Sequence, residues 1–180
     1  LRSGKPFTTC HEWESKALDY LLHTVHPDVV IVSFHPGPTV PDHPAFDAIS
    51  QRALADGMVQ YWRQLSDAGA YIVGIKPTPD PKLNVPDCLS SRHGSVDTCS
   101  VPRSKAVHPT TAIDTAVQAL GPGKATEINL DDYICGPDEC RPVVGNVVVY
   151  RDEKHLTRTY SMTLAPYLQR ALLAIPALQT

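Results

Sequence analysis

Apolar residues recur along the chain in two alternating patterns, one typical of helices and one typical of buried strands. The helical pattern covers four segments: 11–25, 44–68, 109–120 and 157–174. Short β-branched runs bounded by Pro, Gly or Asp cover four others: 28–34, 70–75, 125–130 and 146–150. Strands that are separated by helices favour a parallel sheet with both faces covered. The sequence therefore predicts an α/β fold, a three-layer α/β/α sandwich with a four-stranded parallel sheet.

The apolar faces of the first two helical segments predict part of the core. Trp13 lies on the apolar face of the first, and Phe46, Ile49 and Trp62 lie on the apolar face of the second. We expect all four side chains to be buried. Gly69 follows the second helix at the position of a C-cap.

Residues 78–107 have no clear periodicity and are rich in Pro, Ser, Asp and Cys. A long irregular segment inside a compact domain is usually functional or cross-linked. Cys88 and Cys99 bracket a polar part of it, and Cys135 and Cys140 bracket a Gly-Pro-Asp-Glu turn. We predict two disulfides, Cys88–Cys99 and Cys135–Cys140, each contributing roughly 2–3 kcal/mol by the chain-entropy argument.

Disulfides of this kind indicate an oxidising compartment. Two alternatives remain at this point, free buried thiols in a cytosolic protein and a zinc site, although the cysteines lack the tight spacing that zinc favours. Cys10 has no local partner, so we expect it to be unpaired within these residues, with a mate in a preceding stretch.

Length and charge exclude several classes of protein. The 180 residues fit one domain, and 16 basic against 19 acidic residues give a net charge of −3 without a basic cluster. Nucleic acid is therefore not an expected partner. The first residues, Leu1-Arg2-Ser3-Gly4, lack the apolar core of a signal peptide, and we interpret them as the cut end of a longer chain.

Three loops follow predicted strands: 33–40, 76–80 and 151–155. In parallel sheets the working residues lie beyond the carboxyl ends of the strands, so these loops are the candidates for a site. In the last of them, Asp152 and His155 are three residues apart, directly before an amphipathic helix. That spacing lets a carboxylate orient an imidazole, which can then take a proton from a hydroxyl nucleophile. The alternative is an exposed histidine with Asp152 serving only as a cap.

The segment Arg151-Asp-x-x-His155-Leu-Thr resembles the last block of the SGNH hydrolase family. More narrowly, the chain resembles the SGNH domain fused to membrane O-acyltransferases of the acyltransferase-3 family. Cys10-His-Glu-Trp13, the 28–32 strand and the two cysteine pairs carry the rest of this resemblance. It implies an SGNH/flavodoxin-like sheet over residues 1–180, lacking the N-terminal strand and the nucleophile block.

The same resemblance implies a function. It predicts an extracytoplasmic domain that transfers or hydrolyses acyl groups, most simply acetyl, on cell-surface glycans through a Ser-His-Asp triad. His155 would be the base and Asp152 its orienter, with no metal and no organic cofactor. Its partners would be a carbohydrate acceptor, an acyl donor and a membrane acyltransferase domain.

Two family blocks are missing from the chain. No serine lies in a Gly-Asp-Ser block, so the nucleophile is expected upstream of Leu1. In place of the Gly-x-Asn-Asp block stands Ser33-Phe-His35-Pro-Gly37, which makes Ser33, His35 and Gly37 the candidates for lining the pocket or binding an oxyanion. Two alternatives remain: a degenerate glycan-binding or docking domain, which a missing serine favours, and an unrelated cytosolic α/β protein with free thiols. His43, His93 and His108 are expected to be solvated loop residues.

Overall fold

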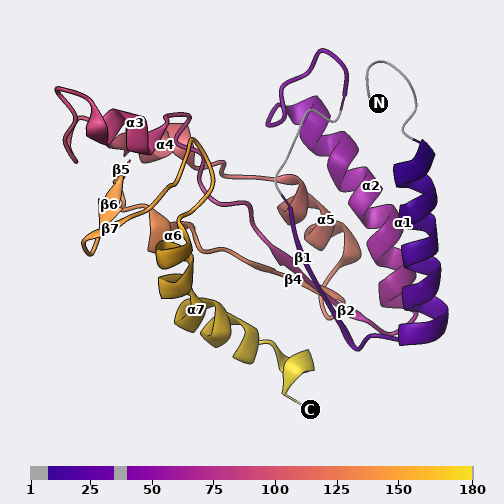
Figure 1. Ribbon diagram of the computed structural model, residues 1–180. Coiled ribbons are helices and arrows are strands. Elements are labelled where there is room, and N and C mark those ends of the chain that lie inside the picture. Colours follow the sequence, from indigo (N-terminus) through magenta and orange to yellow (C-terminus); the bar gives the residue numbers. More distant parts are fainter. Residues whose placement is uncertain (1–7, 35–39, 180) are drawn as a thin grey trace.

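The computed structural model describes residues 8–34 and 40–179 (Figure 1). Its central sheet contains three parallel strands in the order β1–β2–β4. Their bounds are β1 (Val29–Ser33), β2 (Tyr71–Ile75) and β4 (Ala125–Ile128). Because Ser33 pairs with Ile75 and Ile75 with Ile128, all three strands end at one edge of the sheet.

Helices cover both faces of this sheet, as the sequence predicts (Figure 1). One face carries α1 (Thr8–Tyr20), the π-helical turn η1 (Leu21–Val25), α2 (Ala48–Asp67) and α5 (Ala112–Leu120). The other face carries α7 (Arg158–Leu173) and the 3₁₀ turn η2 (Pro176–Leu178). Alternation along β2 sends Ile72 toward α2 and α5 and Val73 toward α7, and both side chains are fully buried.

A second core lies beside the sheet and contains the remaining short elements. These are α3 (Val85–Ser90), β3 (Val101–Pro102), α4 (Arg103–Ala106), α6 (Asp131–Ile134), β5 (Glu139–Cys140), β6 (Val143–Val144) and β7 (Val147–Val148). The first turns of α7 pack against it through Tyr160 and Leu164. Helix α7 therefore bridges the two cores.

Both predicted disulfides are present. Cys88 and Cys99 have their Cα atoms 6.0 Å apart, and Cys135 and Cys140 have theirs 4.1 Å apart. Cys10 is unpaired in the part of the chain that the structure describes, also as expected. The free-thiol and zinc interpretations of the four bridged cysteines are therefore wrong.

The predicted fourth parallel strand is wrong. Residues 147–148 form β7, which pairs antiparallel with β6 in a separate hairpin. The two turn residues, Gly145 and Asn146, have φ angles of 56° and 63°, the left-handed conformation that a tight hairpin requires. Gly-Asn between two pairs of valines was therefore a hairpin signal, and the apolar run continues into the second core as Val149 and Tyr150.

Two predicted core residues lie at the surface. The side chain of Trp13 is 69% exposed on α1, whereas Trp62 is buried on α2 as predicted. Helix α2 begins at Ala48, after the Asp47 side chain caps the Ser50 N–H, and not at residue 44. Ile49 therefore lies in the first helical turn and is 53% exposed.

Gly74 is the point of closest approach between the sheet and α5. A Cβ atom at this position would lie 2.6 Å from the Cγ2 atom of Ile113. The absence of a side chain on this buried strand residue lets α5 pack directly on β2. A second glycine, Gly57 in the middle of α2, has no atom within 4 Å of such a Cβ.

We expect Gly74→Ala to lower the free energy of unfolding by about 1–3 kcal/mol, because Ile113 must move away from the new methyl group. Gly57→Ala is the matched control. It should raise the free energy of unfolding by about 0.5–1 kcal/mol, since alanine is the better helix former. Urea unfolding of both variants measures the two values. Equal effects of the same sign would show that the close approach of α5 is not what selects glycine at position 74.

Candidate active site

The turn that carries Asp152 and His155 is closed by the backbone on both sides. Tyr150 and Leu156 form an antiparallel bridge, and the Arg151 N–H donates to the His155 carbonyl at 2.9 Å. Tyr150 itself is buried, and its hydroxyl donates to the Pro79 carbonyl at 3.0 Å. The turn is therefore anchored to the second core rather than to a strand of the sheet.

Helix α7 begins immediately after this turn. The Thr157 hydroxyl accepts from the Tyr160 N–H at 3.1 Å and donates to the Val148 carbonyl at 2.7 Å. The same hydroxyl therefore caps α7 and connects it to the β6–β7 hairpin. Tyr160 and Leu164, in the first part of α7, are buried in the second core. They hold the start of α7, and with it the preceding loop 151–155, in a fixed position.

Asp152 and His155 form the pair that the sequence predicts. The Asp152 Oδ2 atom lies 2.8 Å from His155 Nδ1. Oδ1 accepts from the backbone N–H groups of Lys154, at 2.9 Å, and His155, at 2.8 Å. These two backbone hydrogen bonds, together with the His155 ring, hold the pKa of Asp152 well below its usual range. The carboxylate is therefore ionised at neutral pH and can orient the imidazole and stabilise its protonated form.

A pocket of about 490 Å³ lies at the carboxyl edge of the sheet, next to this pair. Ser33, the last residue of β1, and His155 both line it, so the end of the first strand and the last loop meet at one site. They meet although the segment before Asp152 is not the neighbouring strand that the sequence analysis assumed. His35 and Gly37, the other two predicted pocket residues, lie outside the described residues.

The floor of the pocket is a buried ion pair. The Lys76 ammonium lies 3.1 Å from the Asp131 carboxylate, and both side chains are 4% exposed. Lys76 also lies 3.5 Å from the Pro109 carbonyl. The loop that starts at Lys76 is one of the three that the sequence singled out, but the role of Asp131 was missed. The sequence indicated this role only through position, since Asp131 lies three residues beyond the carboxyl end of β4.

Three hydroxyl side chains line the same pocket as His155: Ser33, Thr78 and Ser161. The Ser161 hydroxyl donates to the Thr157 carbonyl at 3.0 Å. Neither serine lies in a nucleophile motif. Among the described residues, no group of three or more His, Cys, Asp or Glu side chains could hold a metal ion.

Two of the remaining histidines are not the solvated residues that the sequence suggested. His108 stacks on Phe46 with ring centroids 3.5 Å apart, and burial lowers the pKa of His108 below its usual value. His43 Nδ1 lies 2.6 Å from Asp47, which makes a second His–Asp pair. Asp47 of that pair caps α2, and neither residue lines the pocket that contains His155.

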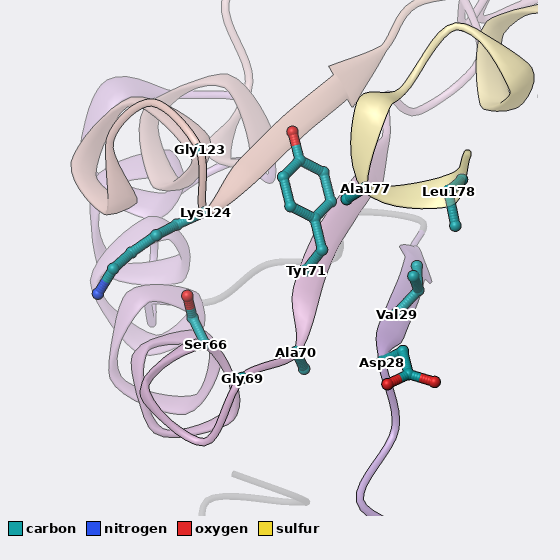
Figure 2. A pocket seen from close by; sticks show the side chains of 10 residues that line it. All are labelled: Asp28, Val29, Ser66, Gly69, Ala70, Tyr71, Gly123, Lys124, Ala177 and Leu178. Carbon is teal, nitrogen blue, oxygen red and sulfur yellow. The ribbon is translucent and has the colours of Figure 1, made fainter. Parts of the chain in front are cut away.

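Figure 2 shows a larger hollow, of about 760 Å³, which lies at the opposite edge of the sheet, where the strands begin. Asp28, Ala70 and Lys124, the residues that lead into β1, β2 and β4, line it together with Tyr71. It contains no histidine or cysteine. The amino-terminal edge of a parallel sheet is not where such folds place reacting groups, so the smaller pocket with His155 is the candidate site.

No helix in the described ranges is long and apolar enough to cross a membrane. A parallel sheet between helical layers, with an aspartate–histidine pair beyond its carboxyl edge, defines a three-layer α/β domain equipped for acid–base chemistry.

A family model described as "SGNH domain (fused to AT3 domains)" matches residues 2–170. The chain therefore belongs to the family of SGNH domains that are fused to AT3 acyltransferase domains.

A solved structure with the same fold is the periplasmic domain of a lipopolysaccharide acetyltransferase from Salmonella ser. Paratyphi A. The TM-score is 0.62 at 16% sequence identity, and the match covers 90% of this chain. The chain spans only 62% of that structure's length. No curated protein sequence matches significantly.

Next to the floor of the pocket, two carboxyl groups share a proton. Burial and a hydrogen bond with Asp114 raise the pKa of Glu127 from its ordinary value of 4.5 to about 8. Although burial acts in the opposite direction, hydrogen bonds from Glu127 and Thr111 lower the pKa of Asp114. Glu127, at the end of β4, is therefore protonated at neutral pH and donates to Asp114, in the first turn of α5.

This pair makes the stability of the domain sensitive to alkaline pH. Because the pKa of Glu127 is raised on folding, its contribution is complete below about pH 4.5 and is lost as the pH rises through about 8. We expect the melting temperature to fall between pH 6.5 and pH 9 in the native chain and to fall less in Glu127→Gln, whose amide still donates to Asp114. Calorimetry at the two pH values tests this. An unchanged pH dependence in Glu127→Gln would assign the effect to another group.

Proposed function

We propose that residues 1–180 form a single extracytoplasmic SGNH domain of an O-acyltransferase, or acylesterase, that acts on acyl groups of cell-surface glycans. Acetyl is the simplest acyl group. The single observation that carries this proposal is the 2.8 Å contact between His155 Nδ1 and Asp152 beside the pocket at the carboxyl edge of the sheet. Membership of the SGNH family supports this proposed function. The acetyltransferase whose periplasmic domain shares the fold supports it as well.

In the proposed mechanism the nucleophile is a serine that precedes Leu1. His155 accepts the serine proton through Nε2 while Asp152 holds Nδ1–H, so the imidazolium that forms faces a fixed negative charge. The serine oxygen attacks the acyl carbonyl, and the resulting alkoxide needs a donor in the pocket. Ser33 is the described candidate for that donor, with His35 and Gly37 the others proposed from the sequence.

Collapse of this intermediate leaves an acyl-serine and a released donor, to which His155 returns the proton. A sugar hydroxyl then repeats the attack, with His155 again accepting the proton, and the acyl group passes to the glycan. Water in place of the sugar gives hydrolysis. No metal or organic cofactor takes part in these steps.

The proposed setting follows from the same observations. Two disulfides in short loops fit an oxidising compartment, so we place the domain on the outer side of the cytoplasmic membrane. Its proposed partners are a carbohydrate acceptor, an acyl donor and the AT3 membrane domain to which its family is fused.

A second function is supported by one specific observation, the lack of a Gly-Asp-Ser block in the chain. A natural protein without that block would use this domain to bind glycan or to dock on its membrane partner. In that case the pocket would bind sugars, but acyl esters would not be turned over.

We expect His155→Ala to abolish most acyl-ester turnover in the natural protein with the preceding residues included. Asp152→Asn should preserve the fold and reduce turnover by up to about 10⁴-fold, the cost of losing tautomer control in other triads. His93→Ala, which changes an exposed loop histidine, is the matched control and should have no effect. Hydrolysis of an aryl acetate, followed spectroscopically, measures all three.

The 180-residue chain alone should be nearly inert in the same assay. Turnover that survives His155→Ala would contradict the acid–base assignment. Turnover by the 180-residue chain that requires His155 would place the nucleophile within these residues. Ser33→Ala and Ser161→Ala would then identify it, since both serines line the pocket.

A further inference from the structure

The charges around the His155 pocket are unbalanced. Three basic side chains line the pocket besides His155: Lys76, Arg151 and Lys154. Asp131 is the only acidic side chain among the described residues that line it, and its carboxylate is committed to Lys76 at 3.1 Å. The buried pair is neutral as a unit, which leaves Arg151 and Lys154 as the other cations that line the pocket, while Asp152 and Glu153, between them in the sequence, do not line it.

Among the described residues, Arg151 has one long ion pair, with Asp152, and Lys154 has none. The Arg151 Nε atom lies 3.7 Å from Asp152, beyond hydrogen-bond range, and the two oxygens of Asp152 already accept from two backbone N–H groups and face His155. The Lys154 ammonium has no carboxylate within 4.0 Å in residues 8–34 and 40–179. The first turn of α7, which follows the loop, carries no acidic residue that could compensate.

A neutral sugar would gain little from this arrangement. Arg151 and Lys154 bring two positive charges to the wall of the pocket, and the positive end of the α7 dipole adds to the same potential. A ligand with a negative group is attracted by that potential. The guanidinium of arginine matches the two oxygens of a carboxylate or phosphate, and lysine adds a point charge. A pocket of about 490 Å³ is also large enough for a sugar unit that carries such a group.

We propose that the pocket selects an acidic sugar, one that carries a carboxylate or a phosphate, and that Arg151 and Lys154 bind its anionic group beside the hydroxyl at which His155 acts. This inference rests on the proposed function, because it names the class of glycan on which that function operates. Arg151 and Lys154 determine specificity in this arrangement and take no part in the proton transfers.

Binding to the 180-residue chain tests the inference without any need for turnover. Three sugars serve as probes: methyl glucuronide, glucose 6-phosphate and methyl glucoside. Amide and imidazole NMR signals of Lys154 and His155 report occupancy of the pocket. We expect at least one of the two acidic sugars to bind about tenfold more tightly than the neutral glucoside, and its affinity to fall as salt is raised from about 20 to 300 mM.

Charge removal should weaken this binding in steps. Arg151→Gln and Lys154→Gln should each weaken binding of the acidic sugar about three- to fivefold, and the double variant about tenfold or more. Arg151→Lys should retain part of the affinity, since the charge remains while the two-point contact of the guanidinium is lost. Lys16→Gln, on the exposed surface of α1, is the control and should change nothing. Unchanged melting temperatures confirm that the variants are folded.

Three results would overturn the inference: equal affinity for acidic and neutral sugars, affinity that does not depend on salt, and no binding of any of the three probes. Preference for the carboxylate or for the phosphate supports it and identifies the anion. Selective binding of an acidic sugar without ester turnover in the longer protein would reject the catalytic proposal alone. Conversely, His155-dependent turnover that is equal on acidic and neutral acetylated sugars would reject only the selectivity.

Discussion

The buried ion pair between Lys76 and Asp131 joins the two halves of this domain. Lys76 follows β2 in the centre of the parallel sheet, and Asp131 opens α6, whose last residue, Ile134, belongs to the second core. With both side chains 4% exposed, the loss of either partner would leave an uncompensated charge in the interior, which typically costs about 3–5 kcal/mol. The position of the second core relative to the edge of the sheet is therefore strongly constrained.

That constraint determines where the turn with Asp152 and His155 can lie. Asp152 and His155 are attached to the second core through buried Tyr150, while Ser33 belongs to the sheet. The pocket exists only where the two units face each other, with Lys76 and Asp131 as its floor. Helix α7 supports the same arrangement, because Tyr160 and Leu164 pack on the second core and Leu168 and Leu172 on the sheet. Thus one helix and one ion pair hold a site whose components come from separate hydrophobic cores.

The parts of the fold that depend on local patterns could be predicted, and those that depend on pairing could not. The β-branched runs around residues 28–34 and 70–75 both form parallel strands, as their apolar character predicts. The second is buried on both faces at the centre of the sheet, whereas the first lies at the edge with Ile31 52% exposed. The run at 146–150 has the same composition, yet Gly145 and Asn146 turn it into a hairpin. Asp152 and His155 were predictable because they lie three residues apart in a single turn. The Asp131 contribution was not, because it depends on a contact with Lys76 across 55 positions of sequence.

The confinement of the acid–base pair to one turn has a consequence for how the site works. In this turn the same carboxylate that orients His155 also closes the backbone, by accepting from the N–H groups of Lys154 and His155. Those donors carry no titratable proton, so they keep Asp152 ionised whether or not the imidazole is protonated. The negative charge that stabilises an imidazolium is therefore in place before any proton is transferred, and little reorganisation is needed at that moment. In the proposed mechanism, the nucleophile would therefore meet an imidazole whose orientation is already fixed by the turn from Asp152 to His155.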